Sequence, residues 1–412
     1  MSDREKPQAP DDRAPLSGLR VLDLSRVLAG PWCTQLLADL GAEVIKIERP
    51  GGGDDTRSWG PPFAGPPADG LSAYFLCANR NKRSVAVNFK HPRGAELLRR
   101  LAGCCDVLIE NFRPGALAAS GLDYESLHTE FPRLVYCSIS GFGQGGPDSQ
   151  RGGYDLLIQA MGGLMSLTGK TDGEPMKVGV ALTDILTGLY ASTGILAALR
   201  QRDASGEGQH IDLALFDVQV AALANQALNY LVSGRVPKRI GNAHPNIVPY
   251  QAFAARDGHL IIAVGNDSQF RRFCETAGLP ELVGDSRYAT NAAHVSNRKE
   301  LLARIEPVIA SRRRDEWIAA LEEADVPCGS VNDLAEVFAA PQLEARGMRF
   351  TFEAGDTSLP QIASPLHLSA APQVRGSAPP RLGADTCAVL AELLGLEDGE
   401  LETLHAAGAI QS

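Results

Sequence analysis

The chain lacks the short motifs that mark several common kinds of site. Its eight cysteines include no Cys-x-x-Cys pair and its eight histidines no His-Glu-x-x-His motif, so we predict no metal site. No Gly-x-Ser-x-Gly sequence occurs, which argues against an ordinary serine hydrolase. These absences leave metal-dependent and serine-hydrolase chemistry as poor explanations of the sequence.

Positive charge and long apolar runs are also scarce. With 39 Lys and Arg against 49 Asp and Glu, the net charge is −10, which argues against nucleic acid or a membrane surface as the main partner. No apolar run approaches the length that spans a bilayer, and we find no secretion signal. We therefore expect a cytoplasmic protein whose cysteines are free thiols. Residues 1–15, rich in charge and proline, predict a disordered tail.

One part of the chain reverses this charge balance. Residues 41–100 contain ten Lys and Arg against six Asp and Glu. Each basic residue taken singly is most simply a solvated surface charge. An acidic protein can nevertheless bind an anion where its basic residues are gathered in one place.

The first 140 residues alternate short apolar runs with helical patterns. Such a βαβ series predicts the α/β class, with a Rossmann-like parallel sheet and helices on both faces. Ligands of these sheets bind beyond the carboxyl ends of the strands. The expected strands are 20–24, 43–47, 84–89, 107–110 and 134–138, the helices are 31–40 and 92–103, and the segments to watch are 25–31, 46–53, 89–91, 111–115 and 140–146.

The rest of the chain predicts a second, smaller α/β domain. A helical period begins at Leu182, followed by a strand at 209–214 and a long helix at 217–232. A loop rich in Pro, Gly and Asn then leads to a new αβ unit. We expect a large domain at 16–200 to which 345–412 return, linker helices at 201–244 and a small domain at 245–335.

A glycine-rich segment, Gly141–Gly146, has the spacing of a dinucleotide-binding fingerprint and follows a predicted strand. That fingerprint needs its last glycine to open a helix, whereas Pro147 and the residues after it predict a loop. We therefore reject a nicotinamide site. A loop that lets an anionic or bulky ligand approach the backbone remains plausible.

Asp184 stands near the start of the periodic helix, between Gly179 and Gly188. From the residues alone, a carboxylate here is most simply a capping or first-turn group favoured by the helix dipole. The same position suits a nucleophile, because the dipole would keep the carboxylate ionised while the glycines leave room around it. The pattern does not decide between the two.

Longer segments resemble a known family. Residues 16–31 read Leu-Ser-Gly-Leu-Arg-Val-Leu-Asp-Leu-Ser-Arg-Val-Leu-Ala-Gly-Pro, and residues 40–50 read Leu-Gly-Ala-Glu-Val-Ile-Lys-Ile-Glu-Arg-Pro. Together with segments at 79–84, 110–115, 140–143 and around Asp184, they resemble the family III CoA-transferases, the relatives of formyl-CoA transferase and carnitine CoA-transferase. The resemblance runs from about Leu16 to Ile410.

The resemblance implies a covalent route in which Asp184 attacks an acyl-CoA thioester. An acyl-CoA and a carboxylic acid are then the substrates, with no cofactor beyond coenzyme A as substrate. It also implies a set of CoA contacts, with Arg49 and Lys90 at the phosphates. The implied CoA-binding residues are Arg49, Val87, Asn88, Phe89, Lys90, Asn111, Phe112, Arg113, Ser140, Gly141, Phe142 and Gly143.

The acid substrate is less constrained. Formyl-CoA transferases carry Gln where this chain has Leu28, beside Ala29 at the acyl site, and a glycine-rich lid that we do not find. The segments 54–62 and 247–253 instead resemble the succinate–hydroxymethylglutarate (glutarate) CoA-transferase branch. That branch implies succinyl-CoA as donor and a dicarboxylate as acceptor, with Arg57, His244 and Tyr250 as candidates for its distal carboxylate.

Two alternatives stay open beside CoA transfer. An α-methylacyl-CoA racemase of the same superfamily uses a His in a Gly-His-Asp motif, where this chain reads Gly153-Tyr154-Asp155. Tyrosine is a poor base at neutral pH. The other alternative is a non-catalytic CoA-binding protein. The family fold further implies an interlocked, ring-like homodimer with no nucleic-acid or membrane partner.

Overall fold

The structure is a computed structural model that describes residues 14–65, 70–354, 357–371 and 374–412. The predicted tail at 1–15 therefore lies outside the described residues except for its last two. The chain divides into two compact units. Unit 1 comprises the described residues up to Gly163, then 178–227 and 344–412, and unit 2 comprises 164–177 and 228–343.

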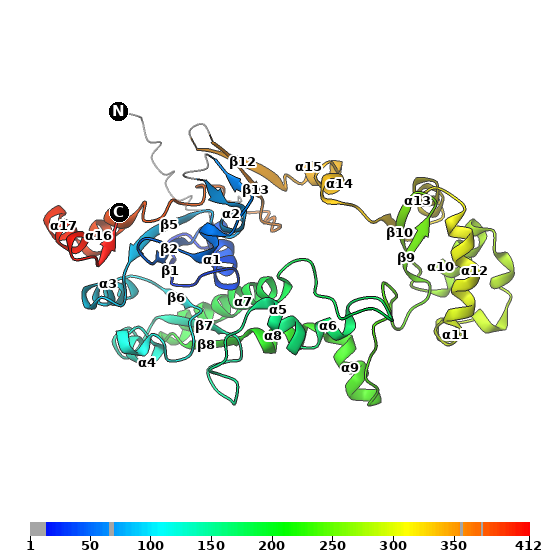
Figure 1. The fold of residues 1–412 in the computed structure, drawn as a ribbon, viewed down its shortest axis with the longest axis horizontal. Coiled ribbons are helices and arrows are strands. Elements are labelled where there is room, and N and C mark those ends of the chain that lie inside the picture. Colours follow the sequence, from blue (N-terminus) through cyan, green and yellow to red (C-terminus); the bar gives the residue numbers. More distant parts are fainter. Residues whose placement is uncertain (1–13, 66–69, 355–356, 372–373) are drawn as a thin grey trace. The chain divides into compact units, whose positions relative to one another are not determined.

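Unit 1 is built on a seven-stranded sheet with the strand order β14-β5-β2-β1-β6-β7-β8 (Figure 1). All neighbours are parallel except β14, which runs antiparallel to β5. The predicted parallel sheet is therefore confirmed, with an antiparallel edge that the sequence did not indicate. The strands are β1 (Arg20–Asp23), β2 (Glu43–Glu48), β5 (Lys82–Val87), β6 (Val107–Glu110), β7 (Val135–Ser140), β8 (His210–Ala214) and β14 (Ile410–Gln411).

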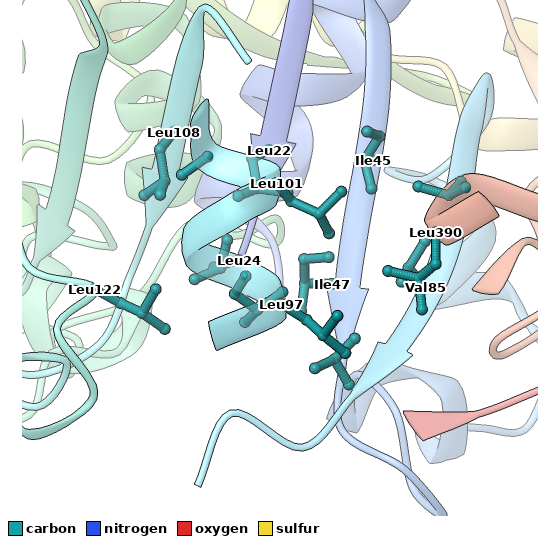
Figure 2. Packing of buried hydrophobic residues seen from close by; sticks show 14 of the residues in the cluster. Leu22, Leu24, Ile45, Ile47, Val85, Leu97, Leu101, Leu108, Leu122 and Leu390 are labelled. Atoms are coloured by element: carbon teal, nitrogen blue, oxygen red, sulfur yellow. The ribbon is translucent and has the colours of Figure 1, made fainter. Parts of the chain in front are cut away.

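Successive residues of these strands point to opposite faces, so the sheet separates two hydrophobic cores. In β1, Val21 joins one core and Leu22 the other. Figure 2 shows the core that contains Leu22, where Leu97 and Leu101 of the covering helix pack on the sheet. The opposite core contains Leu37 of the helix Ala29–Asp39. It also contains side chains of the long helix Leu182–Ser205. Helices on both faces, as predicted, shield both sides of the strands from water.

The helices of unit 1 connect these strands and cover the sheet. At Gly188, a methyl group would come within 2.8 Å of the carbonyl oxygen of Ala29, so only glycine allows α7 to pack this closely on α1. The helices are α1 (Ala29–Asp39), α2 (Ala73–Leu76), α3 (Pro92–Gly103), α4 (Tyr124–Glu130), α5 (Asp155–Met161), α7 (Leu182–Ser205), α8 (Leu215–Ala222), α16 (Thr386–Leu394) and α17 (Asp398–Ala406). Short elements are η1 (Asp55–Ser58), η2 (Ala118–Ser120), β3 (Phe63–Ala64), β4 (Leu71–Ser72), β12 (Arg349–Ala354) and β13 (Thr357–Ile362).

Helix α7 is the most apolar long helix of the chain. An 18-residue window of this 24-residue helix has a mean hydropathy of 1.4 and meets the length and composition expected of a membrane span, which differs from our expectation that no segment would. Its buried residues Ile195 and Leu199 join the core beside α1. We conclude that α7 is a core helix of unit 1.

Buried ion pairs cross the interior of unit 1 beneath the carboxyl ends of the strands. Lys82 Nζ donates to Asp23 Oδ2 at 3.1 Å, and Lys46 Nζ donates to Asp54 Oδ2 at 3.0 Å. All four side chains are essentially shielded from water. Burial would raise the pKa of Asp23, but the charges of Lys82 and Lys46 bring it below its usual value. The basic cluster predicted at 41–100 is thus partly internal.

Residues 410–411 close the edge of the sheet. Ile410 pairs with Val87, and the Gln411 side chain accepts a hydrogen bond from the N–H of Gly51 at 2.6 Å, across 360 residues. The hydroxyl of Thr386 accepts from the N–H of Ala86 at 3.0 Å, across 300 residues. This far end of the chain therefore supports β5.

Unit 2 has a three-stranded antiparallel sheet with the order β11-β10-β9 and its own core around Phe273 and Trp317. Its strands are β9 (Tyr250–Ala255), β10 (Gly258–Ala263) and β11 (Cys328–Ser330), and its helices and turns are α6 (Leu164–Leu167), α10 (Asp267–Ala277), η3 (Pro280–Leu282), η4 (Ser286–Tyr288), α11 (Asn291–Ser296), α12 (Arg298–Ala310), α13 (Arg314–Glu323) and α14 (Leu334–Phe338). Helices α9 (Ala224–Ser233) and α15 (Pro341–Ala345) cross between the units.

The segment expected to be linker helices, 201–244, differs in the structure. Strand β8 and helix α8 lie within it and belong to unit 1. The single helix expected at 217–232 is two helices, α8 and α9, because Ala224 adopts a φ of 45° that a continuous helix does not allow. A periodic apolar pattern cannot reveal such a break.

Candidate active site

Two adjoining cavities lie beyond the carboxyl ends of the large sheet, where the sequence predicts the ligand site. The first, of about 160 Å³, is bordered by Asp184 and by the segments that follow β1, β6 and β7. The second, of about 290 Å³, follows β2 and β5. Arg26 and Phe112 line both cavities. A long ligand can therefore extend from one into the other.

Most of the predicted site residues line one of these cavities. His244 and Tyr250 belong to unit 2. Phe142 and Gly143 follow Gly141 in its loop without lining either cavity. The first cavity contains Leu28, Ala29, Asn111, Phe112, Arg113, Ser140, Gly141 and Asp184, and the second contains Arg49, Val87, Asn88, Phe89, Lys90 and Phe112.

Asp184 is the buried carboxylate of the first cavity. It occupies the third position of α7, and its side chain is 8% exposed. Within the described parts of the chain, we find no hydrogen-bond donor to this carboxylate. Burial, and then the charge of Asp155, raise the pKa of Asp184 to about 7. The expectation that the helix dipole keeps it fully ionised is therefore wrong near neutral pH, because desolvation outweighs the dipole.

This pKa predicts how the reaction rate depends on pH. Should Asp184 be the nucleophile that the resemblance implies, only its ionised form attacks, so kcat/KM for an acyl-CoA donor is expected to fall about tenfold per pH unit below pH 7. Above pH 7 it should level off. A rate profile from pH 5 to 9, with circular dichroism to confirm that the fold is retained, measures this limb. A midpoint near pH 4 would contradict the burial argument.

The glycine-rich loop after β7 forms one wall of the first cavity. A methyl group at Gly141 would lie 2.7 Å from Cα of Gly153, so the two loops touch backbone to backbone. The hydroxyl of Ser140 accepts from the N–H of Gly143 at 2.8 Å and closes the turn. The next helix begins at Asp155, well after Gly146. The loop is therefore not a dinucleotide fingerprint, as predicted.

Hydrogen bonds between the segments that follow β1 and β6 form the border of the two cavities. Asn111 Oδ1 accepts from the N–H of Arg26 at 2.9 Å, and its Nδ2 donates to the Arg26 carbonyl at 2.7 Å. The carboxylate of Glu110 accepts from the N–H of Phe112 at 2.7 Å. These bonds fix the turn that the resemblance assigns to CoA, because each polar group has a partner inside the protein.

The second cavity combines an aromatic surface with a basic rim. Phe89 and Phe112 meet edge to face with ring centroids 5.5 Å apart. Arg49 and Lys90 are exposed beside them, and Arg49 pairs with Asp55 at 2.7 Å. An exposed pair of this kind is worth little and can open for a stronger anion. Aromatic rings next to mobile cations suit a base attached to phosphates.

The structure places Arg57 differently from the expectation. Its guanidinium donates two hydrogen bonds of 2.7 Å to the carboxylate of Glu48 and a third to the Pro380 carbonyl at 3.1 Å. It also lies 3.8 Å from the ring centroid of Phe75. Arg57 is thus engaged inside the protein, and holding a substrate carboxylate would require it to leave Glu48.

His244 and Tyr250 form a local pair within unit 2. Their ring centroids are 5.2 Å apart, and the N–H of His244 donates to the Tyr250 carbonyl at 2.9 Å. Nδ1 of His244 accepts from the N–H of Asn246 at 3.1 Å, which leaves Nε2 to carry the proton of the neutral ring. A protonated Nε2 beside a phenol is a reasonable donor to a carboxylate.

Sequence reasoning missed three charged residues of the site. Arg26 and Arg151 line the first cavity, and Asp155 lies next to Asp184 at the start of α7. Asp155 had been considered only as the end of a Gly-Tyr-Asp segment. Asp155 is the first residue of α5, a helix that the sequence analysis did not predict, and nothing in the sequence indicated that it caps a different helix.

The geometry defines an α/β protein in which the buried Asp184 carboxylate lines a cavity that adjoins a second, cation-rimmed cavity. Residues 16–386 match the family model of CoA-transferase family III. The match covers most of the chain, and with the relatives described next it shows that the chain belongs to this family and is a family III CoA-transferase.

Relatives agree over nearly the whole length. The chain is 51% identical over 392 residues to the succinate–glutarate CoA-transferase of Agrobacterium fabrum, covering 94% of this chain and 98% of that protein. It is 45% identical over 399 residues to the succinyl-CoA:glutarate CoA-transferase of Homo sapiens, covering 96% and 90%. A solved CAIB/BAIF family protein from Brucella suis aligns with a TM-score of 0.83 at 50% identity, covering 92% and 99%.

Proposed function

We propose that this enzyme transfers CoA from succinyl-CoA to a dicarboxylate, glutarate or hydroxymethylglutarate, through a covalent bond to Asp184. The observation that carries the proposal is the buried Asp184 carboxylate in the first of two adjoining cavities. The names of the two glutarate CoA-transferases to which the chain is similar support the choice of substrates.

The first half-reaction activates the donor. An oxygen of the Asp184 carboxylate attacks the thioester carbonyl carbon of succinyl-CoA, the carbon–sulfur bond breaks, and CoA thiolate leaves. The product is a mixed anhydride between succinate and Asp184. The thiolate then attacks the aspartyl carbonyl, which releases succinate and leaves an aspartyl–CoA thioester. Each step joins activated acyl species and avoids one difficult direct exchange.

The second half-reaction repeats these steps with the acceptor. A carboxylate of glutarate attacks the aspartyl thioester, thiolate leaves again, and an aspartyl–glutaryl anhydride forms. The thiolate attacks the glutaryl carbonyl, which yields glutaryl-CoA and restores the Asp184 carboxylate. Water would hydrolyse either intermediate, so the burial of Asp184 protects the route. Arg57 could hold the distal carboxylate only if it leaves Glu48; His244 and Tyr250 stay candidates that the resemblance names.

Contacts far from the thioester hold the donor in place. The Phe89–Phe112 surface faces the adenine, and the pantetheine passes the turn at Asn111 toward Ser140. Binding energy at the nucleotide end can be used to fix the reacting carbonyl against Asp184. Remote cations therefore contribute to the rate as well as to affinity.

Removing one of these cations should weaken CoA binding. We expect Arg49→Ala and Lys90→Ala each to raise the Kd for CoA by about three- to tenfold, since a charge-assisted contact is lost. The Kd for dephospho-CoA should change less. Calorimetric titration of both ligands measures this, with Arg200→Ala on the exposed side of α7 as the matched control. Dephospho-CoA lacks the 3′-phosphate. An equal loss of affinity for both ligands would therefore contradict a contact between these cations and that phosphate.

The decisive experiment follows the acyl group. Enzyme mixed with succinyl-CoA and trapped with hydroxylamine should carry a hydroxamate at Asp184, which peptide mass spectrometry locates. A panel of acids supplied with succinyl-CoA then identifies the acceptor, and glutarate should rank among the best. A turning-over enzyme without label at Asp184 would sink the mechanism. A chain that binds CoA without exchanging labelled succinate would be the non-catalytic alternative.

The racemase alternative gains no support from the site. Tyr154, 67% exposed at the wall of the first cavity, stands where the racemase motif has its His. A phenol does not exchange an α-proton readily at neutral pH. Proton exchange from a 2-methylacyl-CoA in deuterated water should therefore be negligible.

A homodimer is part of the proposal. Around α5 and α7, large apolar side chains are exposed in the single chain, and such patches mark interfaces. Light scattering should give twice the mass of the chain, and a monomer would remove the interlocked arrangement. These exposed residues include Tyr154, Leu156, Val180 and Tyr190.

A cytoplasmic setting also remains part of the proposal. All eight cysteines are free thiols, and Cys33 and Cys137 are buried. A reducing compartment keeps such thiols unpaired.

A further inference from the structure

Helix α7 begins without a capping side chain of its own. Its N-cap residue is Ala181, which offers no acceptor to the first N–H groups. Asp155, the first residue of α5, supplies that acceptor from another helix. Its Oδ1 accepts from the N–H of Thr183 at 2.8 Å and, more weakly, from the N–H of Asp184 at 3.4 Å. The backbone of Asp184 is thus bonded to this carboxylate.

A buried glutamine holds Asp155 in this position. Gln159 Nε2 donates to Asp155 Oδ2 at 2.7 Å, and its Oε1 accepts from the N–H of Val178 at 2.9 Å. From the other side, the hydroxyl of Thr183 donates to the side chain of Gln219 at 2.7 Å. Gln159, Thr183 and Gln219 are all 0–1% exposed. The segment leading into Asp184 is therefore fixed from two helices, α5 and α8.

The Asp155 carboxylate also changes the charge around Asp184. The positive end of α7 would favour an ionised Asp184, but Asp155 takes up the first N–H groups and opposes that end with a full negative charge. The other titratable or charged groups nearby are the phenols of Tyr74 and Tyr154 and the cavity residues Arg26, Arg113 and Arg151. After burial, Asp155 is the named cause that raises the pKa of Asp184.

We propose that Asp155 is a positioning residue of the transfer reaction. Its carboxylate starts α7 in the register that presents Asp184 to the cavity, and its charge adds to the effect of burial on the Asp184 carboxylate. This inference rests on the proposed function, in which Asp184 is the nucleophile. A more basic carboxylate attacks a thioester faster once ionised, and the best value lies near the working pH.

Two substitutions separate the cap from the charge. Asp155→Asn keeps an oxygen for the N–H of Thr183 and removes the charge, whereas Asp155→Ala removes both. For Asp155→Asn we expect the acidic limb of kcat/KM to move down by at least about half a pH unit, so that activity at pH 6, relative to the plateau, rises about threefold. For Asp155→Ala the plateau should also fall about tenfold or more, because Asp184 is no longer held.

A matched control makes the same chemical change elsewhere on α7. Asp203→Asn removes one exposed charge from its last turn and should leave the profile unchanged. The midpoint for carbodiimide labelling of Asp184, read by mass spectrometry, reports the same shift without turnover. If Asp155→Asn leaves the midpoint of the pH profile unchanged, Asp155 has no charge role. If the Asn and Ala variants reach the same plateau of kcat/KM, Asp155 has no capping role. An Asp184→Ala enzyme that still transfers CoA would instead remove the proposed function itself.

Discussion

Asp184→Asn should reduce CoA transfer by a factor of about a thousand or more. The amide keeps the shape of the carboxylate but cannot form the acyl anhydride, so the covalent route closes. CoA affinity should stay within a few fold, because the second cavity, which we propose binds the nucleotide, is lined by other residues. Exchange of labelled succinate into succinyl-CoA measures the loss. Near-native exchange by the variant would show that another group is the nucleophile.

The same substitution should stabilise the protein at high pH. Burial raises the pKa of Asp184 from 3.8 to about 7, so between these values the folded state holds a proton that the unfolded chain has released. Stability therefore falls as the pH rises from 4 to 7 and stays low above it, a cost on the order of a few kcal/mol. Asp184→Asn removes this cost. Unfolding in urea should show the variant more stable at pH 8 and equal at pH 4.

Replacing Lys82 should instead destabilise the protein, by a free energy of unfolding of similar size. Its Nζ donates to Asp23, to the Pro31 carbonyl and to Asn79, all within 3.1 Å and away from water. Lys82→Met leaves the buried Asp23 carboxylate without its main partner, and breaking such pairs costs about 3–5 kcal/mol. Urea unfolding at pH 7 measures the change in the free energy of unfolding.

Two further variants test that reasoning. Arg99→Ala breaks exposed pairs with Glu96 and Glu130 and should change stability by less than about 0.5 kcal/mol. Adding Asp23→Asn to Lys82→Met should recover part of the loss, since the orphaned charge is gone. If Lys82→Met is as mild as Arg99→Ala, the ion pair at the strand ends contributes no more than a surface contact.

The sequence revealed features that repeat along the chain or that a family shares. The alternation of short apolar runs with helical patterns over the first 140 residues predicts the parallel sheet, and the ends of the predicted strands predict the place of the cavities. The segment around Asp184 led us, through resemblance, to propose this residue as the nucleophile. Each of these signals lies within a short stretch of residues, so it can be read without knowing the fold.

Features that join distant residues were not predictable in this way. Strand β14 has two residues, too short for a periodic signal, and it exists because Val87 offers an open edge. The cap of α7 joins Asp155 to Thr183 across 28 residues. The sequence gives no sign that Arg57 is paired, because its partner Glu48 is identified only by the packed structure. The pKa of Asp184 depends on burial, which follows only from the packed structure.

The late pairing of β14 with β5 has a consequence for how the protein is made. Ribosomes add about 5–20 residues per second, so the 300 residues that separate Ala86 from Thr386 take roughly 15–60 s to synthesise. During that interval the outer edge of β5 has neither its partner strand nor the helix that begins at Thr386. An unpaired strand edge invites association with other nascent chains. Yield of this enzyme in cells should therefore respond strongly to chaperone supply and to growth temperature.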